Sequence, residues 1–548
     1  MKKYILSFTL LTSLLSFTGC KKFLDVNSDP DTPQNPDASS VFPAMLAAIP
    51  RGTQFDGRFI GKYIQNFGVS ASTRAEAIWD NHGFQGFPTA TDVGGDIWRQ
   101  AYYGLGSNLD YIINEGKVKG QWDYVGAGYA LKALMFQMTT DVYGEIIFAE
   151  AFKENTSVFK YDDQETVYKG VDSLCRLAVE NLSRTDLKTS NSQLSKGDYV
   201  YNGSRTLWTK LVYGIMAKNF HRYTNKTTVY NTRLADSVIK YVDLSFANTN
   251  EDFVIPFDAT KNDDTNFFGP YRDNLTFFRQ TNFIVKLLDG TTLANTTSFA
   301  NRDPRIRHML SASNDTTNGN GGYRGVDAGA GDAGTGNARV AVPWGDSTYA
   351  NPSATRFDPT RGKYLFRDKA VSPVMTYSEL QFTKAEAAYR KANSTTAYTA
   401  YINGIKGHFD FINRAVFPRS NTPIYNTAPI PTAEINRYLV SSNVKQAAAD
   451  LTLTDIMLQK YIALWGWGFV ETWVDIRRFH YTDIDAATSQ PVYKNFFTPA
   501  FPATNNGNFA YRIRPRYNSE YVWNRDELDR IGALAQDYHT RRVWFSLP

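Results

Sequence analysis

The chain has 548 residues and a formal net charge of +5 at pH 7. That length allows one large core or two to three domains, and the absence of a basic block argues against nucleic acid as a partner. The aromatic residues, 36 Phe, 33 Tyr and 10 Trp, suit a core and also a surface that binds flat apolar faces such as those of sugar rings.

The first twenty residues have the pattern of a secretory signal. Lys2 and Lys3 precede an apolar run over residues 4–17, and small residues follow up to Cys20. The run is shorter than the roughly 20 apolar residues of a membrane span. The Thr-Gly pair before Cys20 resembles a bacterial lipobox, so we expect residues 1–19 to be removed and acyl chains (palmitate) to anchor Cys20. The alternative is an ordinary cleaved signal with an incidental cysteine.

The next segments are predicted to be irregular. Residues 20–40 contain three prolines among Asp, Asn and Ser, which is typical of an extended leader. Residues 41–95 mix short apolar pieces with Gly, Asn and Thr, and they are assigned to loops that carry Trp79 and Phe84.

Helical periodicity begins near Asp96. Apolar side chains at steps of four and three, at Trp98, Tyr102, Leu105, Leu109 and Ile112, predict a helix that is broken at Gly116 and Gly120. A second helix follows it, and the two form a helical hairpin. Gly126 and Gly128 in the second helix would let a neighbouring helix approach closely. Further helices without a strict repeat period are predicted over three segments, 166–182, 204–223 and 232–244.

Residues 248–372 lack helical periodicity and contain a glycine-rich tract, which suggests functional loops. The strongest helical pattern covers residues 454–479, with Trp465 and Trp473 predicted to be in the core. Three further helices are predicted before it, over 376–392, 398–415 and 432–440. Residues 480–548 are irregular again.

Several segments, in order from the amino terminus to the carboxyl terminus, resemble the SusD/RagB family of nutrient-binding outer-membrane lipoproteins, in a divergent branch. They are Phe23-Leu24-Asp25 behind Cys20, Asp141 to Ile146, Asp303-Pro304-Arg305, Met375 to Leu380 with Ala385-Glu386-Ala387, Lys460 to Leu464, Glu471-Thr472-Trp473 with Arg477-Arg478, and Arg514 to Tyr517 with Ser519-Glu520 and Asn524.

The resemblance implies a mostly α fold, in which tetratricopeptide-like helical hairpins support a loop-rich ligand-binding half within one domain over residues 41–548. The scaffold would cover 96–245 and 376–480, and the binding regions 41–95, 248–372 and 480–548. It also implies a non-enzymatic lipoprotein, surface-exposed at the cell outer membrane, that captures oligosaccharide for a SusC-like TonB-dependent β-barrel transporter. Alternatives are a peptide cargo, a surface glycoside hydrolase, and a structural or adhesive lipoprotein.

Ligand-binding candidates are aromatic residues in loops with polar neighbours, because sugar rings present an apolar face and a rim of hydroxyl groups. They are Trp79, Phe84, Asn266, Phe268, Tyr271 and Trp344. Each of them could instead anchor a loop by packing into the fold.

Four carboxylates on the predicted helices raise the question of acid–base catalysis, since glycosidases use paired carboxylates. Roles on helix faces and caps are favoured for Asp141, Glu145, Glu379 and Glu386. No cofactor is expected, because the Gly-x-Gly-x-x-Gly match at 329–334 follows no strand pattern and precedes no helix. Ca²⁺ binding by loop carboxylates is the alternative to simple solvation, and the residues concerned are Asp315, Asp327 and Asp332.

Overall fold

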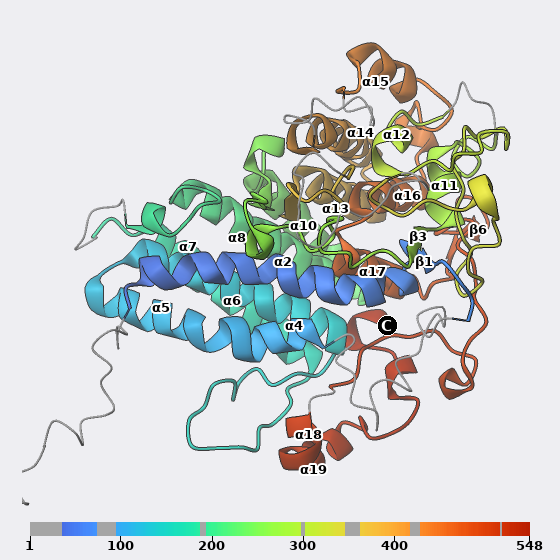
Figure 1. Ribbon diagram of the computed structural model, residues 1–548. Helices are drawn as coiled ribbons and strands as arrows, with labels where there is room; N and C mark the ends of the chain where they lie inside the picture. The colour runs from blue at the N-terminus through green and yellow to red at the C-terminus, as the bar shows by residue number, and fades with distance from the viewer. Residues whose placement is uncertain are drawn as a thin grey trace, which may run out of the picture.

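The computed structural model describes residues 36–73, 95–186, 193–296, 302–345, 362–416, 428–515 and 518–548. Helices predominate over these ranges, and the strands form only two-stranded pairs. The expected mostly helical fold is therefore confirmed. The elements fall into a set of stacked amino-terminal helices, a second helical set and a loop-rich region (Figure 1).

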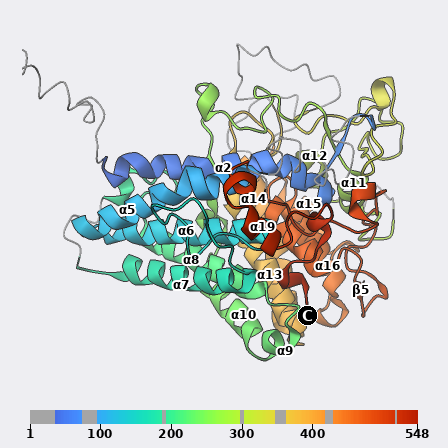
Figure 2. The ribbon, with the colours of Figure 1, turned by 90° about the horizontal axis from the view of Figure 1, so that it is seen from below.

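The amino-terminal helices stack side by side as hairpins, and Figures 1 and 2 show α5, α6, α8 and α7 as neighbours. Gly120 ends α5 in the left-handed region with φ +69°, which glycine adopts without strain. A Cβ on Gly126 would lie 2.5 Å from Leu182 and one on Gly128 2.8 Å from Ile113, so the predicted close approach is confirmed. The elements are α4 (Asp96–Arg99), the π-helix η3 (Gln100–Leu105), α5 (Gly106–Lys119), α6 (Trp122–Tyr143), α7 (Gln164–Ser183), α8 (Arg205–His221), α9 (Thr227–Val229) and α10 (Ala235–Leu244).

A long helix, α2 (Ala38–Tyr63), covers the last three residues of the predicted leader and residues 41–63 of the segment assigned to loops, and for these residues the sequence-based assignment is wrong. Pro43 and Pro50 lie inside the helix, and three glycines interrupt its apolar pattern. The glycines are needed for packing, because a Cβ on Gly57 would lie 2.4 Å from the ring of Phe469. Helix α2 crosses the molecule over both helical sets (Figure 1) and its length comes from tertiary contacts rather than from local propensity.

The second helical set agrees with the predicted segments except at its strongest pattern. Residues 454–479 form two helices rather than one, because Gly466 lies between them with φ +84° and its N–H donates to Asn66 Oδ1 at 2.8 Å. Trp465 and Trp473 are buried, as predicted. The helices are α13 (Tyr377–Arg390), α14 (Ser394–Phe411), α15 (Thr432–Leu439), α16 (Leu453–Leu464) and α17 (Phe469–Arg478).

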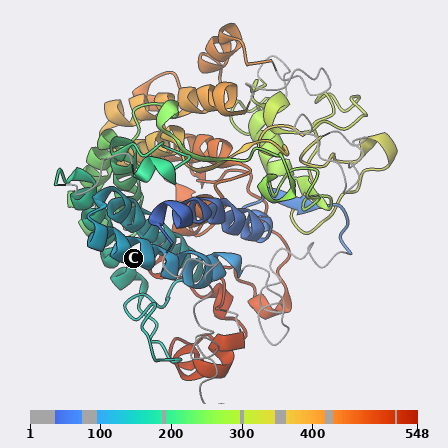
Figure 3. The same ribbon diagram turned by 60° about the vertical axis from the view of Figure 1, so that its left-hand side comes forward.

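The loop-rich region lies opposite the stacked amino-terminal helices in Figures 1 and 3. It confirms that residues 248–372 are largely irregular within the described ranges. Its strands pair antiparallel, as β1 (Phe67–Val69) with β3 (Phe278–Gln280), β2 (Phe253–Pro256) with β4 (Val371–Met375), and β5 (Ile484–Asp485) with β6 (Gln490–Pro491). Short helices complete it and the carboxyl-terminal segment: α11 (Asn282–Leu288), α12 (Ile306–Met309), α18 (Asn518–Trp523) and α19 (Arg525–Arg530).

Candidate functional site

Three of the residues singled out from the sequence, Cys20, Trp79 and Phe84, lie outside the described residues. Tyr271 is half-buried in the loop-rich region, where its backbone N–H donates to Asp368 Oδ1 at 2.9 Å. Its ring therefore remains a candidate for ligand contact.

The other three candidates, Asn266, Phe268 and Trp344, are fully buried. The amide of Asn266 donates to the carbonyl oxygens of Leu365 at 2.7 Å and Arg367 at 2.8 Å, so it holds two loop segments together. Phe268 and Trp344 belong to the main hydrophobic core. Since none of the three offers surface to a ligand, the structure corrects their assignment from ligand contact to loop anchoring.

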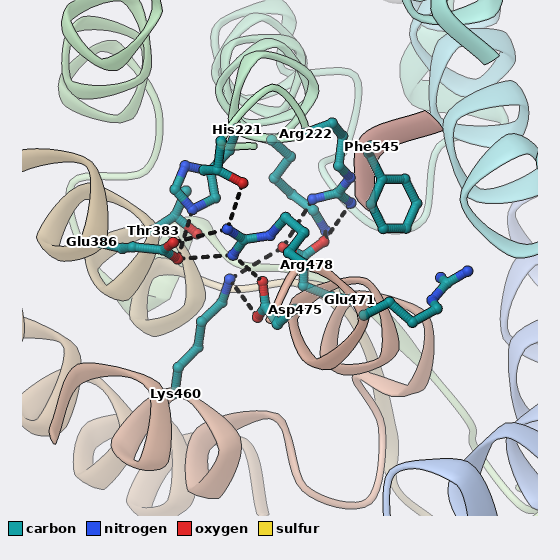
Figure 4. Close-up of polar contacts among 12 residues, drawn as sticks. His221, Arg222, Thr383, Glu386, Lys460, Glu471, Asp475, Arg478 and Phe545 are labelled. Atoms are coloured by element: carbon teal, nitrogen blue, oxygen red, sulfur yellow. Dashed lines mark hydrogen bonds and ion pairs between the residues drawn. The ribbon is translucent and has the colours of Figure 1, made fainter. Parts of the chain in front are cut away.

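The carboxylates considered for catalysis are engaged in ion pairs, three of them in the interior. Glu386 contacts Arg478 at 2.8 Å (Figure 4), and Asp141 contacts Arg222 at 2.8 Å. Glu379 completes a capping box with Thr376, as the cap interpretation expected, and pairs with Lys218 at 2.6 Å. Glu145 pairs with Arg512. The three buried groups cannot meet a glycosidic bond, and this supports the structural interpretation.

These buried charges form one network that joins α6, α8, α13, α16 and α17. Glu471 is shared by Arg222 at 2.6 Å, Lys218 at 3.2 Å and Lys460 at 3.2 Å. Burial alone would raise the pKa of Glu471, but these three cations hold it well below its ordinary value. His221 is different, because burial lowers its pKa to about 4 and leaves the imidazole neutral at pH 7.

Among the described ranges, no group of three or more His, Cys, Asp or Glu side chains is arranged to hold a metal ion. Asp315 pairs with Arg324 at 2.8 Å. Asp327 accepts from the amide of Asn282, and Asp332 accepts from the N–H of Val340. The three aspartates thus have separate partners.

A pocket of about 520 Å³ lies between α4, the loop that follows α6, and α18. In Figure 1 the teal loop runs between α4 and α18. The pocket is lined mainly by rings, which are Trp98, Tyr102, Tyr103, Phe152 and Phe159. We call it the aromatic pocket.

The rings of the aromatic pocket form a connected wall. The centroids of Trp98 and Tyr102 are 4.6 Å apart, and those of Tyr102 and Phe152 are 6.3 Å apart. The Tyr102 hydroxyl donates to the carbonyl oxygen of Ile147 at 2.6 Å, which fixes the ring against the loop. Arg99, Ser519 and Glu520 supply polar groups at the same pocket. Apolar walls with a few polar groups are typical of small-molecule sites.

The π-helix η3 presents two of these rings from consecutive positions, Tyr102 and Tyr103. Single π-helical turns inside α-helices are often found at functional sites. Gly106, directly after η3, leaves room for the Phe152 ring, because a Cβ there would lie 1.8 Å from Cζ of Phe152 and 2.4 Å from the carbonyl oxygen of Ala101. Any larger residue would displace the ring or the helix.

Tyr103 stands between the aromatic pocket and a second cavity. Its side chain is 77% exposed, and the Arg99 guanidinium lies 5.9 Å from its ring centroid. The second cavity has a volume of about 920 Å³ and is also lined by Arg99 and Tyr103, together with residues of α2 and β2. An extended ligand can therefore contact Tyr103 while it occupies both cavities.

Sequence reasoning missed this site. Trp98 and Tyr102 matched the apolar stripe of a helix, which correctly predicted that they face the protein but not that a pocket adjoins them. Tyr103 is off that stripe, and the only available signal was a pair of adjacent tyrosines followed by Gly104 and Gly106.

Comparison with known proteins agrees with the fold. Residues 61–499 match the SusD-like family model described as starch-binding and associating with the outer membrane. Similar solved structures include a chitin-binding protein, with a TM-score of 0.68, 18% identity and coverage of 93% of this chain and 100% of that one. A SusD/RagB family protein from Bacteroides thetaiotaomicron is also similar, with a TM-score of 0.62, 21% identity and coverage of 93% of this chain and 99% of that one.

A chitin-binding SusD homologue from Flavobacterium johnsoniae is similar, with a TM-score of 0.62, 20% identity and coverage of 93% of this chain and 98% of that one. No curated protein sequence matches the chain. The family match spans most of the chain, from the end of α2 past β6, and includes both helical sets and the loop-rich region between them. This chain therefore belongs to the SusD-like family of proteins, which is associated with the outer membrane.

Proposed function

We propose that the protein is a non-enzymatic lipoprotein that captures oligosaccharide at the aromatic pocket and delivers it to a SusC-like TonB-dependent transporter. The observation that carries the proposal is the half-buried rings of Tyr102 and Phe152, backed by the buried ring of Trp98, beside the exposed ring of Tyr103. Sugar rings present apolar faces to such walls, and the polar groups at the mouth can bond their hydroxyls. The buried, ion-paired state of Asp141, Glu379 and Glu386 supports capture rather than hydrolysis.

The cavity on the other side of Tyr103 supports a ligand of more than one sugar unit. Two of the similar structures bear names that refer to chitin binding, so chito-oligosaccharides are the first probes and malto-oligosaccharides the second. The N-acetyl methyl group of a chitin unit suits an apolar ring pocket, whereas a starch unit has only its ring face to offer. A peptide cargo remains the alternative outcome.

The direct test is calorimetric titration of chitotetraose and maltotetraose into the mature protein and two variants. Tyr103→Ala should weaken binding by about tenfold, equivalent to about 1.4 kcal/mol. Phe497→Ala is the matched control, because its ring is also partly exposed, at 41%, but lies outside the pocket lining. Equal affinities for the two variants, or binding of peptides without any oligosaccharide, would refute the proposed site.

Anchoring and partnership require separate tests. No helix in the described ranges is long and apolar enough to cross a membrane. We propose that the acylated Cys20 holds the protein at the outer membrane, and mass spectrometry of the mature amino terminus should find it lipidated. Affinity purification from membranes should recover a TonB-dependent barrel, and recovery of the protein alone would count against the transport role.

A further inference from the structure

Trp523, the last residue of α18, is 63% exposed. It is the only tryptophan among the described residues that is largely exposed, since the others are buried or half-buried. Single exposed apolar residues are common on protein surfaces, so the surroundings of the ring decide what its exposure means. Those surroundings belong to the aromatic pocket.

Helix α18 carries Trp523 on the same face as two lining residues of the aromatic pocket, Ser519 and Glu520. Successive residues of an α-helix are about 100° apart around the axis, so position 523 falls between positions 519 and 520 in direction. It lies about one turn, or roughly 5 Å, further along the axis. Trp523 is not itself a lining residue, and it therefore extends the wall of the pocket beyond the cavity.

Hydrogen bonds hold α18 against the loop that follows α6. The backbone N–H of Phe159, a ring of the pocket lining, donates to Asn524 Oδ1 at 3.0 Å. The amide of Asn524 donates in turn to Glu520 Oε2 at 3.1 Å, and the hydroxyl of Tyr161 donates to the same oxygen at 2.6 Å. The residue directly after Trp523 is thus tied to the pocket wall, which fixes the end of α18 beside the pocket.

Trp523 and Tyr103 flank the aromatic pocket from different sides of α4. Tyr103 leads to the second cavity, which is lined partly by residues of α2. Figures 1 and 3 show α2 and α18 on opposite sides of α4. The pocket has a volume of about 520 Å³, so it holds a short oligosaccharide and a longer chain must extend beyond it. A linear chain can therefore pass from Trp523 through the pocket to Tyr103.

We propose that Trp523 is a stacking platform for the sugar unit next to those in the aromatic pocket, so that the site binds an internal stretch of a linear oligosaccharide. The apolar face of a sugar ring lies on the indole while its hydroxyl groups stay in water, which suits an exposed ring. A protein partner is the competing occupant, because Val158 and Val522 are also exposed. The sugar is favoured because the platform continues the pocket wall. The inference rests on the proposed function, since it needs sugar in the pocket.

The test is calorimetric titration of a short and a long chain, chitobiose and chitohexaose or maltose and maltohexaose, into the full mature protein and its variants. The long chain should bind the parent protein more tightly than the short one. Trp523→Ala should lose about three- to tenfold in affinity for the long chain and none for the short chain, because only the long chain reaches the indole. Trp523→Phe keeps a ring and should recover most of that loss.

The matched control is Val522→Ala, because Val522 is exposed on the same helix but has no ring. It should bind both chains as the parent protein does. Iodide quenching of tryptophan fluorescence gives a second readout. The long chain should protect the exposed indole from iodide in the parent protein and in Val522→Ala, and this protection should be absent in Trp523→Ala.

Three results would each overturn the inference while leaving the proposed function intact. They are an unchanged affinity of Trp523→Ala for the long chain, equal losses for both chain lengths, and an equal loss in Val522→Ala. Loss of the barrel from affinity purification of Trp523→Ala, with sugar binding unchanged, would assign the ring to a protein contact instead. Absence of sugar binding by the parent protein would refute the proposed function and this inference with it.

Discussion

Removing the buried cation Lys460 should strongly destabilise the protein. Its ammonium group lies 2.8 Å from Asp475 and 3.2 Å from Glu471, and all three side chains are buried. At an effective dielectric constant of about 20, these separations give gross attractions of about 6 and 5 kcal/mol. The variant no longer has to desolvate an ammonium ion, so the net loss expected for Lys460→Met is about 3–5 kcal/mol.

Methionine has a similar length to lysine, so the loss measures the missing charge rather than a cavity. Urea unfolding followed by tryptophan fluorescence gives the free energy of unfolding, with equal denaturant slopes as the check that the same transition is observed. The control is Lys169→Met, because Lys169 pairs with Glu165 at 2.7 Å but is 67% exposed, and its loss of stability should lie within the error of the unfolding measurement.

A loss for Lys460→Met within about 1 kcal/mol of the control would refute the view that the network is held by buried charge. A second variant makes the reasoning stricter. Lys460 and Asp475 are in direct contact, so the double variant Lys460→Met/Asp475→Asn should lose less free energy of unfolding than the sum of the two single losses. Strict additivity would mean that the two residues act independently.

The remaining predictions concern two glycines and a histidine. Gly106→Ala should lower both oligosaccharide affinity and stability, because its Cβ would lie 1.8 Å from the Phe152 ring and 2.4 Å from the Ala101 carbonyl oxygen; unchanged affinity in calorimetry would contradict this. Gly466→Ala should cost about 1–2 kcal/mol in urea unfolding, since φ is +84° there, and no loss would show that the turn can relax. His221 is neutral when folded with a pKa of about 4 but ionises near 6.5 when unfolded, so acidification from pH 7 to 5 should remove about 2 kcal/mol of stability. His221→Gln should flatten that part of the pH profile, and an unchanged profile would assign the effect to other groups.

The sequence determined the elements that follow from local periodicity. The α5–α6 hairpin, α7, α8 and α13 to α15 were predictable because their apolar stripes repeat at helical spacing and their ends are marked by residues such as Gly120 and Thr376. The burial of Trp465 and Trp473 followed from the same spacing. The resemblance of scattered segments to the SusD/RagB family, now confirmed as family membership, came from sequence alone as well.

Only the tertiary structure decided the features that depend on contacts between distant segments. Helix α2 escaped prediction because prolines and glycines disrupt its pattern, yet packing on two helical sets stabilises it. The sequence suggested that Asn266 contacts a ligand from a loop, but its side chain is hydrogen-bonded to Leu365 and Arg367, which lie about a hundred positions further along the chain. The aromatic pocket needs α4, the loop after α6 and α18 together. Spacing along the chain reports which face of a helix is apolar, whereas a pocket exists only where separate elements meet and fail to fill the space between them.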